Sequence, residues 1–246
     1  MRDKRANPPA TVVCVHGAGG GGWEWAIWAR VLAARGFAVI APDLQPVAAG
    51  IEATRLADYS AQVLQWCRGV DAPVVLVGAS LGGRLALLTA RAAGASALVL
   101  VNPLPPEGLA GPHPPRPPRV PWGRERSLAR TRRALPDADA AARLYAFRRW
   151  RDESGAALDE ACAGFPLEPQ ACPVLLLASE CDDDVPAASS RALAAALAAD
   201  FELLTAATHV GPLLGRSAAA TAERVARWIE QARLAGSAAH ENLAAL

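Results

Sequence analysis

The sequence predicts an α/β fold with a doubly wound, mostly parallel sheet. Short apolar stretches alternate with longer alanine-rich stretches of helical character, which is the order of elements in such folds. Several of the short stretches, such as 73–79 and 173–179, are apolar at nearly every position, as expected for strands covered on both faces. The length of 246 residues suits one domain, or one domain with an insertion.

The predicted strands are apolar stretches that end where glycine, proline or polar residues begin: 11–16, 37–41, 73–79, 97–102, 173–179 and 201–205. The predicted helices between them are rich in alanine and leucine: 23–35, 54–67, 81–93, 187–199 and 217–233. In sheets of this kind, ligands bind beyond the carboxyl ends of the strands. We therefore expect functional side chains directly after the strands.

Between residues 104 and 171 the alternation stops, and we expect an insertion there, with the core formed by 1–103 and 172–246. Prolines are too dense from 103 to 121 for a helix or a central strand, because each lacks a backbone N–H donor. Seven arginines and one acid follow in 116–133, and helices are expected around 138–150 and 156–163. We expect this segment to form a helical, proline-rich lid over the sheet edge. The alternative is a solvent-exposed excursion with no role at the site.

Ser80 is the candidate nucleophile. It lies in Gly78-Ala79-Ser80-Leu81-Gly82, a G-x-S-x-G motif between a predicted buried strand and a predicted helix. The turn that this motif requires is so tight that its flanking positions leave almost no space for side chains, and it places the serine in a strained conformation with its oxygen exposed. The Leu81 N–H, at the start of the helix, is suited to bind an oxyanion.

A serine hydroxyl needs a base, which a third group must orient. His209 follows a predicted strand and precedes a glycine, a proline and a helix, so it lies at the carboxyl edge of the sheet. The other histidines are less suitable as a base: His16, His113 and His240. For His16, we expect the backbone setting to matter more than the ring. The acid is expected within Asp182-Asp183-Asp184, after the strand 173–179, where one or two of the side chains can face the histidine. The chain order serine, aspartate, histidine is that of α/β hydrolases.

The glycine run 17–22 allows two interpretations. It satisfies G-x-G-x-x-G after a strand and before a helix, with Asp43 after the next strand, as in a dinucleotide-binding site. Against this, residues 23–25 are bulky for a helix that must pack on a strand and a pyrophosphate, and the serine, acid and histidine stay unexplained. In a hydrolase the run lets the loop approach the substrate, and the Ala18 N–H joins that of Leu81 in an oxyanion hole.

Three further residues are candidate substrate contacts: Gly19, Trp23 and Trp122. Trp122, with the arginine-rich stretch, would place apolar surface and positive charge above the serine, which suggests an apolar substrate with a carboxylate or phosphate. Packing within the first helix is the alternative for Trp23, and simple exposure to solvent is the alternative for the arginines.

These residues resemble the α/β-hydrolase superfamily over about 11–103 and 173–233. The resemblance is carried by the serine motif, the acid loop, the histidine, and two short pieces after the first two strands: His16-Gly17 and Ala41-Pro42-Asp43-Leu44. In the family's pattern the catalytic aspartate stands four positions before a proline, which implies Asp182, four before Pro186, with Asp183 as the fallback. Ser179 and Thr208 stand where the family usually has glycine.

The residues and the resemblance together predict a serine hydrolase. It would act on an ester, lactone or thioester, or on a C–C bond next to a carbonyl, through an acyl-enzyme on Ser80 with His209 as base and Asp182 as acid. One alternative is lyase or isomerase acid–base chemistry with the same residues. Another is a hydrolase-like protein that binds a ligand without turnover.

The composition gives no indication of a cofactor or of a macromolecular partner. A net charge of +1 provides no electrostatic reason to expect nucleic acid or a membrane. The five cysteines form neither a CxxC pair nor a cluster with histidine, so no metal site is expected. The first residues are charged without a following apolar stretch, so we expect no secretory signal and a cytoplasmic enzyme with a small-molecule substrate. The oligomeric state is not predicted.

Overall fold

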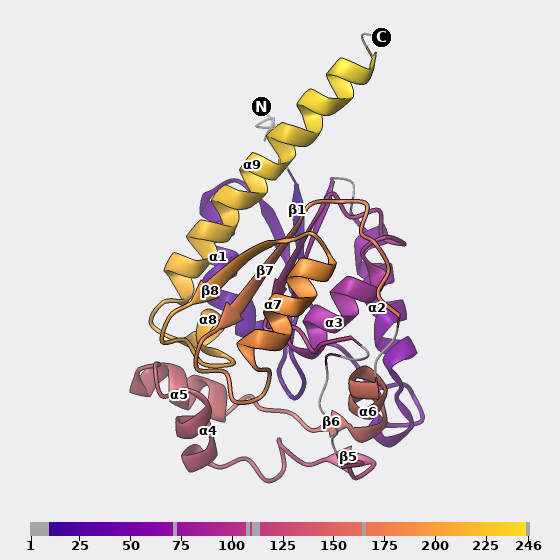
Figure 1. The fold of residues 1–246 in the computed structure, drawn as a ribbon. Coiled ribbons are helices and arrows are strands. Elements are labelled where there is room, and N and C mark those ends of the chain that lie inside the picture. Colours follow the sequence, from indigo (N-terminus) through magenta and orange to yellow (C-terminus); the bar gives the residue numbers. More distant parts are fainter. Residues whose placement is uncertain (1–9, 71–72, 107–108, 110–113, 164–165, 245–246) are drawn as a thin grey trace, which may run out of the picture.

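A computed structural model describes residues 10–70, 73–106, 109, 114–163 and 166–244, with side chains up to residue 232. At its centre is a six-stranded, entirely parallel sheet in the order β2-β1-β3-β4-β7-β8 (Figure 1). The strands are β1 (Thr11–Val15), β2 (Ala38–Ile40), β3 (Val74–Ala79), β4 (Ala97–Val101), β7 (Val174–Ser179) and β8 (Asp200–Leu204). The predicted fold class is confirmed, and each predicted strand end lies within one residue of the observed one.

Helices cover both faces of the sheet, because the central strands present apolar side chains in both directions. In β3, Val75 and Val77 belong to one buried cluster and Leu76 to the other. The first cluster packs against the helices α1 (Ala26–Ala34), α8 (Gly211–Leu214) and α9 (Ala218–Ala244). The second packs against α2 (Leu56–Arg68), α3 (Leu81–Thr89) and α7 (Ala187–Ala196). Two short 3-10 helices lie in the loops between these elements, η1 (Gly22–Trp25) and η2 (Ile51–Ala53), and of the two only η1 has buried residues.

Helix α9 extends past the body of the molecule toward the C-terminus (Figure 1). It is longer than predicted, because the alanine-rich sequence continues past Arg233 without a proline and one glycine costs a helix only about 1 kcal/mol. Its beginning packs on α1, and Arg35 holds Glu230 through two hydrogen bonds of 3.1 and 2.6 Å. In the described part of the chain, no helix combines the length and the apolar character needed to cross a bilayer.

Residues 104–171, called the insertion below, leave the sheet after β4 and return at β7. In Figure 1 its elements lie together beyond one end of the sheet. The elements are β5 (Arg119–Val120), α4 (Leu128–Ala134), α5 (Ala140–Phe147), β6 (Glu153–Ser154) and α6 (Gly155–Ala163). Helices α5 and α6 are those predicted. Helix α4 was not predicted, although Ser127 caps it by accepting the Arg130 N–H, and neither was the antiparallel β5–β6 pair. Part of the proline-rich stretch, residues 107–108 and 110–113 with His113, lies outside the described residues.

Candidate active site

Ser80 stands in the turn between β3 and α3 with φ 53° and ψ −118°. Such a left-handed backbone is rare outside glycine and persists only where the surroundings hold it. Here the Ser80 N–H donates to the Val101 carbonyl (3.0 Å), and the Ser80 carbonyl accepts from the N–H groups of Arg84 (3.1 Å) and Leu104 (3.2 Å). These bonds hold the turn while the serine lines a cavity.

The glycines on either side of Ser80 are required by close backbone contacts. A Cβ atom at Gly78 would lie 2.1 Å from the Gly82 carbonyl oxygen, and one at Gly82 would lie 2.1 Å from that of Val15. Both contacts are with backbone, which cannot rotate aside as a side chain can. The motif therefore permits β1, β3 and α3 to meet closely enough to form the turn.

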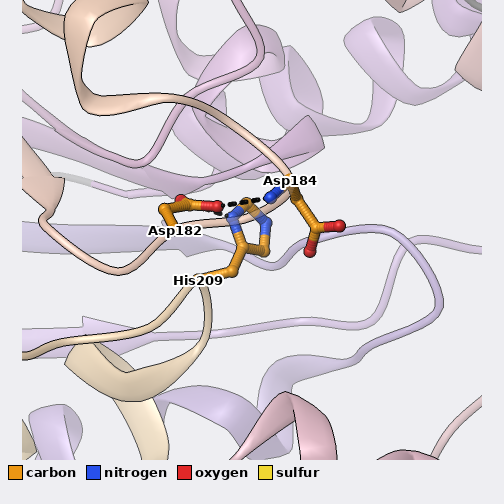
Figure 2. Close-up of side chains that lie close together, drawn as sticks. All are labelled: Asp182, Asp184 and His209. Carbon is orange, nitrogen blue, oxygen red and sulfur yellow. Dashed lines mark hydrogen bonds and ion pairs between the residues drawn. The ribbon is translucent and has the colours of Figure 1, made fainter.

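His209 and Asp182 meet at the carboxyl ends of β7 and β8 (Figure 2). The His209 Nδ1 atom lies 2.7 Å from Asp182 Oδ2. Asp182 Oδ1 accepts the N–H groups of Asp184 (2.9 Å) and Val185 (2.8 Å), so the buried carboxylate is held on both oxygens. A carboxylate only accepts hydrogen bonds, so Nδ1 carries the proton. Of the three adjacent aspartates, it is Asp182 that contacts the histidine.

The charges around His209 raise its pKa. Burial of the ring lowers the pKa, but the hydrogen bond and the charge of Asp182 outweigh this. The charge of Asp184 adds to the rise, as does that of Glu24 when it is ionised. The protonated form of the ring is thus stabilised by its surroundings. This is the form that a histidine adopts after it has taken a proton from a nucleophile.

Asn102 anchors the loop that carries His209. Its Nδ2 donates to the His209 carbonyl (2.8 Å) and to Ser179 Oγ (2.9 Å), while its Oδ1 accepts the Ser179 N–H (2.7 Å). Ser179, a departure from the family's glycine, thus forms part of a buried polar link between β4 and β7. Asn102 was not identified from the sequence, although its place at the carboxyl end of the predicted strand 97–102 could have indicated it.

Thr208, the second departure, links the histidine loop to the insertion. Its hydroxyl donates to Asp137 Oδ1 (3.2 Å), and the Asp137 carbonyl accepts the Arg216 N–H (3.2 Å). The segment on both sides of His209 is therefore held by Asp137, a residue between α4 and α5.

The ring of His16 holds the glycine loop, a role that the sequence analysis did not expect of it. Its Nε2 accepts the Leu44 N–H (2.9 Å), which assigns the ring proton to Nδ1, and Nδ1 donates to the Gly17 carbonyl (2.8 Å). Burial lowers the pKa of His16 to about 4, so the ring is neutral near pH 7. The sequence prediction missed this because Leu44 follows a different strand.

Three N–H groups of the glycine loop donate to side-chain carboxyl groups: Gly17 to Glu24 (3.2 Å), Gly19 to Glu153 (3.0 Å) and Gly22 to Asp43 (2.7 Å). In a dinucleotide site, the acid at the position of Asp43 would bind a ribose. Here Asp43 accepts a hydrogen bond from the glycine loop itself. By contrast, the N–H groups of Ala18 and Leu81 have no hydrogen-bond partner among the described residues. These are the two donors that the sequence predicts for an oxyanion hole.

Glu24 is a buried acid that the sequence prediction considered only for its bulk. Its carboxyl group packs against Gly20, where a Cβ atom would overlap with it, and only 2% of the residue is exposed. Burial raises the pKa of Glu24 to about 8, although the Gly17 N–H and the nearby His209 act in the opposite direction. Near pH 7 the group is therefore mainly protonated.

A cavity of about 690 Å³ lies between the sheet edge and the insertion, and Ser80, His209 and Ala18 all line it. Its apolar lining comes from both sides: Leu104, Pro105, Leu109, Trp122, Trp150, Leu158, Val185 and Val210. Its charged lining carries both signs: Arg116, Arg126, Arg130, Glu125, Asp183 and Asp184. The volume and apolar character are those of a small-molecule site.

The other predicted substrate contacts are placed differently. Trp122 is 41% exposed and lines the cavity. Gly19 and Trp23 are not among the lining residues, and Trp23 packs edge-on against Tyr145 and Trp150 of the insertion, with ring centroids 5.7 and 5.2 Å apart. A role in binding substrate stays a prediction for all three.

Asp182, Asp184 and His209 each offer an atom that could ligate a metal ion, and these atoms lie within 4.8 Å of one another. However, the oxygens of Asp182 are already hydrogen-bonded, to the His209 ring and to two backbone N–H groups. In Figure 2 the Asp184 carboxylate points away from the other two side chains. This donor arrangement suits an acid that orients a histidine better than it suits a metal ligand set.

Comparison with known proteins gives a family match and a set of similar structures. The family model described as "Alpha/beta hydrolase family" matches residues 12–226. No curated protein matches the sequence. Among solved structures, a methylesterase from Arabidopsis has a TM-score of 0.71 at 16% identity, covering 90% of this chain and 99% of that one. A pyrethroid hydrolase from Sphingobium faniae has a TM-score of 0.66 at 20% identity, with 90% and 96% covered. The thioesterase domain from the curacin biosynthetic pathway has a TM-score of 0.66 at 19% identity, with 88% and 90% covered.

Proposed function

This chain belongs to the alpha/beta hydrolase family, and from that premise we propose that it is a serine hydrolase that cleaves an ester, lactone or thioester through an acyl-enzyme. The observation that carries the proposal is the 2.7 Å contact of His209 with Asp182, on the same cavity as a serine in a strained turn. A base oriented by a buried acid, on the same cavity as a serine hydroxyl, is the arrangement that nucleophilic catalysis needs.

In the proposed reaction, Asp182 holds the Nδ1 proton of His209, which leaves Nε2 to accept a proton. Nε2 takes the Ser80 hydroxyl proton as Ser80 Oγ bonds to the substrate carbonyl carbon. His209 then gives that proton to the leaving alcohol or thiol, and the acyl group stays on Ser80. Water, deprotonated by His209, attacks the acyl carbon and releases the acid, and Ser80 regains its proton.

The negative oxygen of each tetrahedral intermediate would be held by the N–H groups of Ala18 and Leu81. Neither donor has another partner in the described part of the protein, so both are available to the substrate. The Leu81 N–H also lies at the N-terminus of α3, where the helix dipole favours negative charge. Removal of one such donor from a working site costs roughly 2.7–4 kcal/mol of transition-state stabilisation.

We further propose that the insertion acts as a lid. It contributes Trp122, Trp150 and Leu158 to the lining of the cavity that Ser80 also lines, so its position would determine which substrates fit. The apolar lining supports substrates with an apolar acyl or alcohol part. The methylesterase and the thioesterase domain among the similar structures make esters and thioesters the first classes to assay.

A substrate panel with Ser80→Ala tests the proposal. Short and long acyl esters, lactones and acyl thioesters are assayed with the wild type, and the variant is expected to lose at least about 10³-fold in kcat/KM. Ser96→Ala is the matched control, because the Ser96 hydroxyl bonds to the Val74 carbonyl at the far end of the sheet; its activity should equal that of the wild type. A burst of the first product, with an acyl adduct on Ser80 seen by mass spectrometry, separates acyl transfer from lyase or isomerase chemistry. Turnover of a confirmed substrate by Ser80→Ala within tenfold of the wild type would contradict the proposal.

A further inference from the structure

The insertion contacts the glycine loop directly, at Gly19. The Gly19 N–H donates to Glu153 Oε2 at 3.0 Å, and the Gly19 carbonyl accepts the Arg151 N–H at 2.7 Å. Gly19 has φ +67°, and a Cβ atom there would lie 2.6 Å from the ring of Trp122. The insertion thus holds both polar backbone groups of Gly19 and occupies the space where a side chain would stand.

Glu153 receives hydrogen bonds on both of its oxygens. Besides the Gly19 contact, Oε1 accepts the Tyr59 hydroxyl (2.7 Å) and the Ser154 N–H (2.8 Å), and the residue is only 4% exposed. Burial and the adjacent Glu153 charge raise the pKa of Tyr59, so its hydroxyl stays a donor. A buried carboxylate with three donors is strongly held. Through it, the insertion, helix α2 and the glycine loop are joined at one point.

This contact bears on the direction of the Ala18 N–H. The carbonyl of the peptide before Ala18 is held by His16 Nδ1 (2.8 Å) and the Gly20 N–H (3.2 Å). The N–H of the peptide after Ala18 is held by Glu153. Peptide units are planar, so a hydrogen bond on one side of a unit also sets the orientation of the other side. The Ala18 N–H belongs to the first of these units, and Glu153 holds the second. Rotation about the Ala18 backbone bonds is therefore restricted from both sides, and the N–H keeps its direction.

We propose that Glu153 is a positioning residue of the active site: through its bond to Gly19 it aims the Ala18 N–H at the substrate oxyanion. The insertion then sets the rate of bond cleavage in addition to forming a wall of the cavity. This inference rests on the proposed function, because the oxyanion in question is that of the tetrahedral intermediate in acyl transfer. Glu153 is not among the residues that line the cavity, so it acts through the loop.

Glu153→Gln tests this role, with Glu160→Gln as its matched control. Glu160 also belongs to the insertion and also joins it to α2, by accepting the Leu56 N–H (2.9 Å) and Arg55 Nη1 (2.9 Å), but it has no hydrogen bond to the glycine loop. The glutamine amide presents N–H donors where three donors already converge, so the Gly19 bond is lost or displaced. Active enzyme is counted by titration with a fluorophosphonate, so that kcat refers to folded sites only.

For Glu153→Gln we expect kcat to fall about 10- to 100-fold and KM to stay within about threefold, because a displaced donor affects the transition state more than bound substrate. Affinity for a boronic acid that mimics the tetrahedral intermediate should fall by a factor similar to that for kcat. Glu160→Gln should stay within about twofold of the wild type in both measurements. A merely structural role would lower the thermal midpoint and the count of active sites but leave kcat and boronate affinity unchanged.

If the kcat of Glu153→Gln lies within twofold of that of Glu160→Gln, the proposal is overturned. Should Glu153→Gln fail to fold, Tyr59→Phe is used as the test of the proposal instead. It removes one hydrogen-bond donor from Glu153 Oε1 and keeps the aromatic ring. A fall in kcat of threefold or more at unchanged KM supports the proposal, and an unchanged kcat overturns it. Turnover that survives in Ser80→Ala contradicts the proposed function and this inference with it. Loss in Ser80→Ala with no effect of Glu153→Gln contradicts this inference alone.

Discussion

His16 and His209 both lie at the carboxyl edge of the sheet, yet their bonding suits them to different tasks. Both ring nitrogens of His16 are bonded to backbone groups, and burial lowers its pKa to about 4. Among the described residues, the His209 ring has a hydrogen bond only at Nδ1, to Asp182, and the pKa of the ring is raised. A ring whose two nitrogens are occupied cannot take a proton from a serine. At the scale of single residues, bonding partners distinguish the structural histidine from the proposed base.

The pH dependence of activity should reflect the raised pKa of His209. The base is lost when the ring is protonated, so kcat/KM is expected to fall as pH decreases through a midpoint above 6.5. Asp184→Asn removes one of the charges that raise this pKa, so the midpoint should move to lower pH. Glu180→Gln is the control, because Glu180 lies in the same loop and is not among the charges that act on His209. Equal midpoints for Asp184→Asn and the wild type would contradict the assignment.

At the scale of elements, the turn between β3 and α3 depends on close approach of three backbones. Gly82 faces β1, where a Cβ atom would lie 2.1 Å from the Val15 carbonyl oxygen and 2.4 Å from that of His16. The strand cannot yield without disturbing the sheet, since Val15 pairs with Gly78 of β3. The motif around Ser80 is thus as much a packing requirement as a chemical one.

Gly82→Ala is expected to destabilise the fold by about 2–3 kcal/mol, the cost of overpacking against a rigid backbone. Gly69→Ala is the matched control at the end of α2. Its φ is −81° and a new Cβ atom would meet its neighbours at 3.5 Å or more, so it should be neutral or stabilise by about 0.4–1 kcal/mol. Urea denaturation measures both free energies of unfolding. A Gly82→Ala protein as stable as Gly69→Ala would show that the turn tolerates a side chain.

At the scale of the whole molecule, two buried groups near the glycine loop give stability opposite dependences on pH. The folded protein keeps a proton on Glu24 that the unfolded chain releases above about pH 4.5, so this contribution to stability is lost as pH rises toward 8. His16 binds a proton below about pH 6.5 in the unfolded chain but only below about pH 4 in the folded protein. The stability that comes from keeping His16 neutral is therefore lost as pH falls from 6.5 to 4. The two effects oppose each other between pH 4.5 and 6.5. Above 6.5, Glu24 and the raised pKa of His209 act in the same direction.

The thermal midpoint of the wild type should therefore decrease between pH 6.5 and 8. Glu24 alone would change the free energy of unfolding by up to about 1.4 kcal/mol per pH unit while it titrates. Glu24→Gln cannot titrate, so its thermal midpoint should depend less on pH in this window. Glu160→Gln replaces a more exposed carboxyl and should keep the wild-type slope. Identical slopes for Glu24→Gln and the wild type would show that Glu24 is not protonated near neutral pH.

The strands and most helices could be predicted because their signals are local. Continuous apolar stretches bounded by glycine, proline or polar residues specify where a buried strand begins and ends. Helix α4 was missed because its arginines hide any apolar periodicity, and the β5–β6 pair because two-residue strands have no pattern to detect. Asn102 and Glu153 were missed for a different reason, since their importance lies in partners far away in the sequence.

The sequence by itself determined the order of the elements, the fold class and the turn around Ser80, because these follow from residues that are neighbours in the chain. Residue chemistry alone left the acid open among three aspartates; a family pattern selected Asp182, and only the tertiary structure places its carboxylate on His209. The tertiary structure also decided which loop N–H groups are occupied and which are available. The bond between Gly19 and Glu153 joins residues 134 positions apart. Contacts of this kind depend on how the insertion folds back over the sheet, and no local pattern records that.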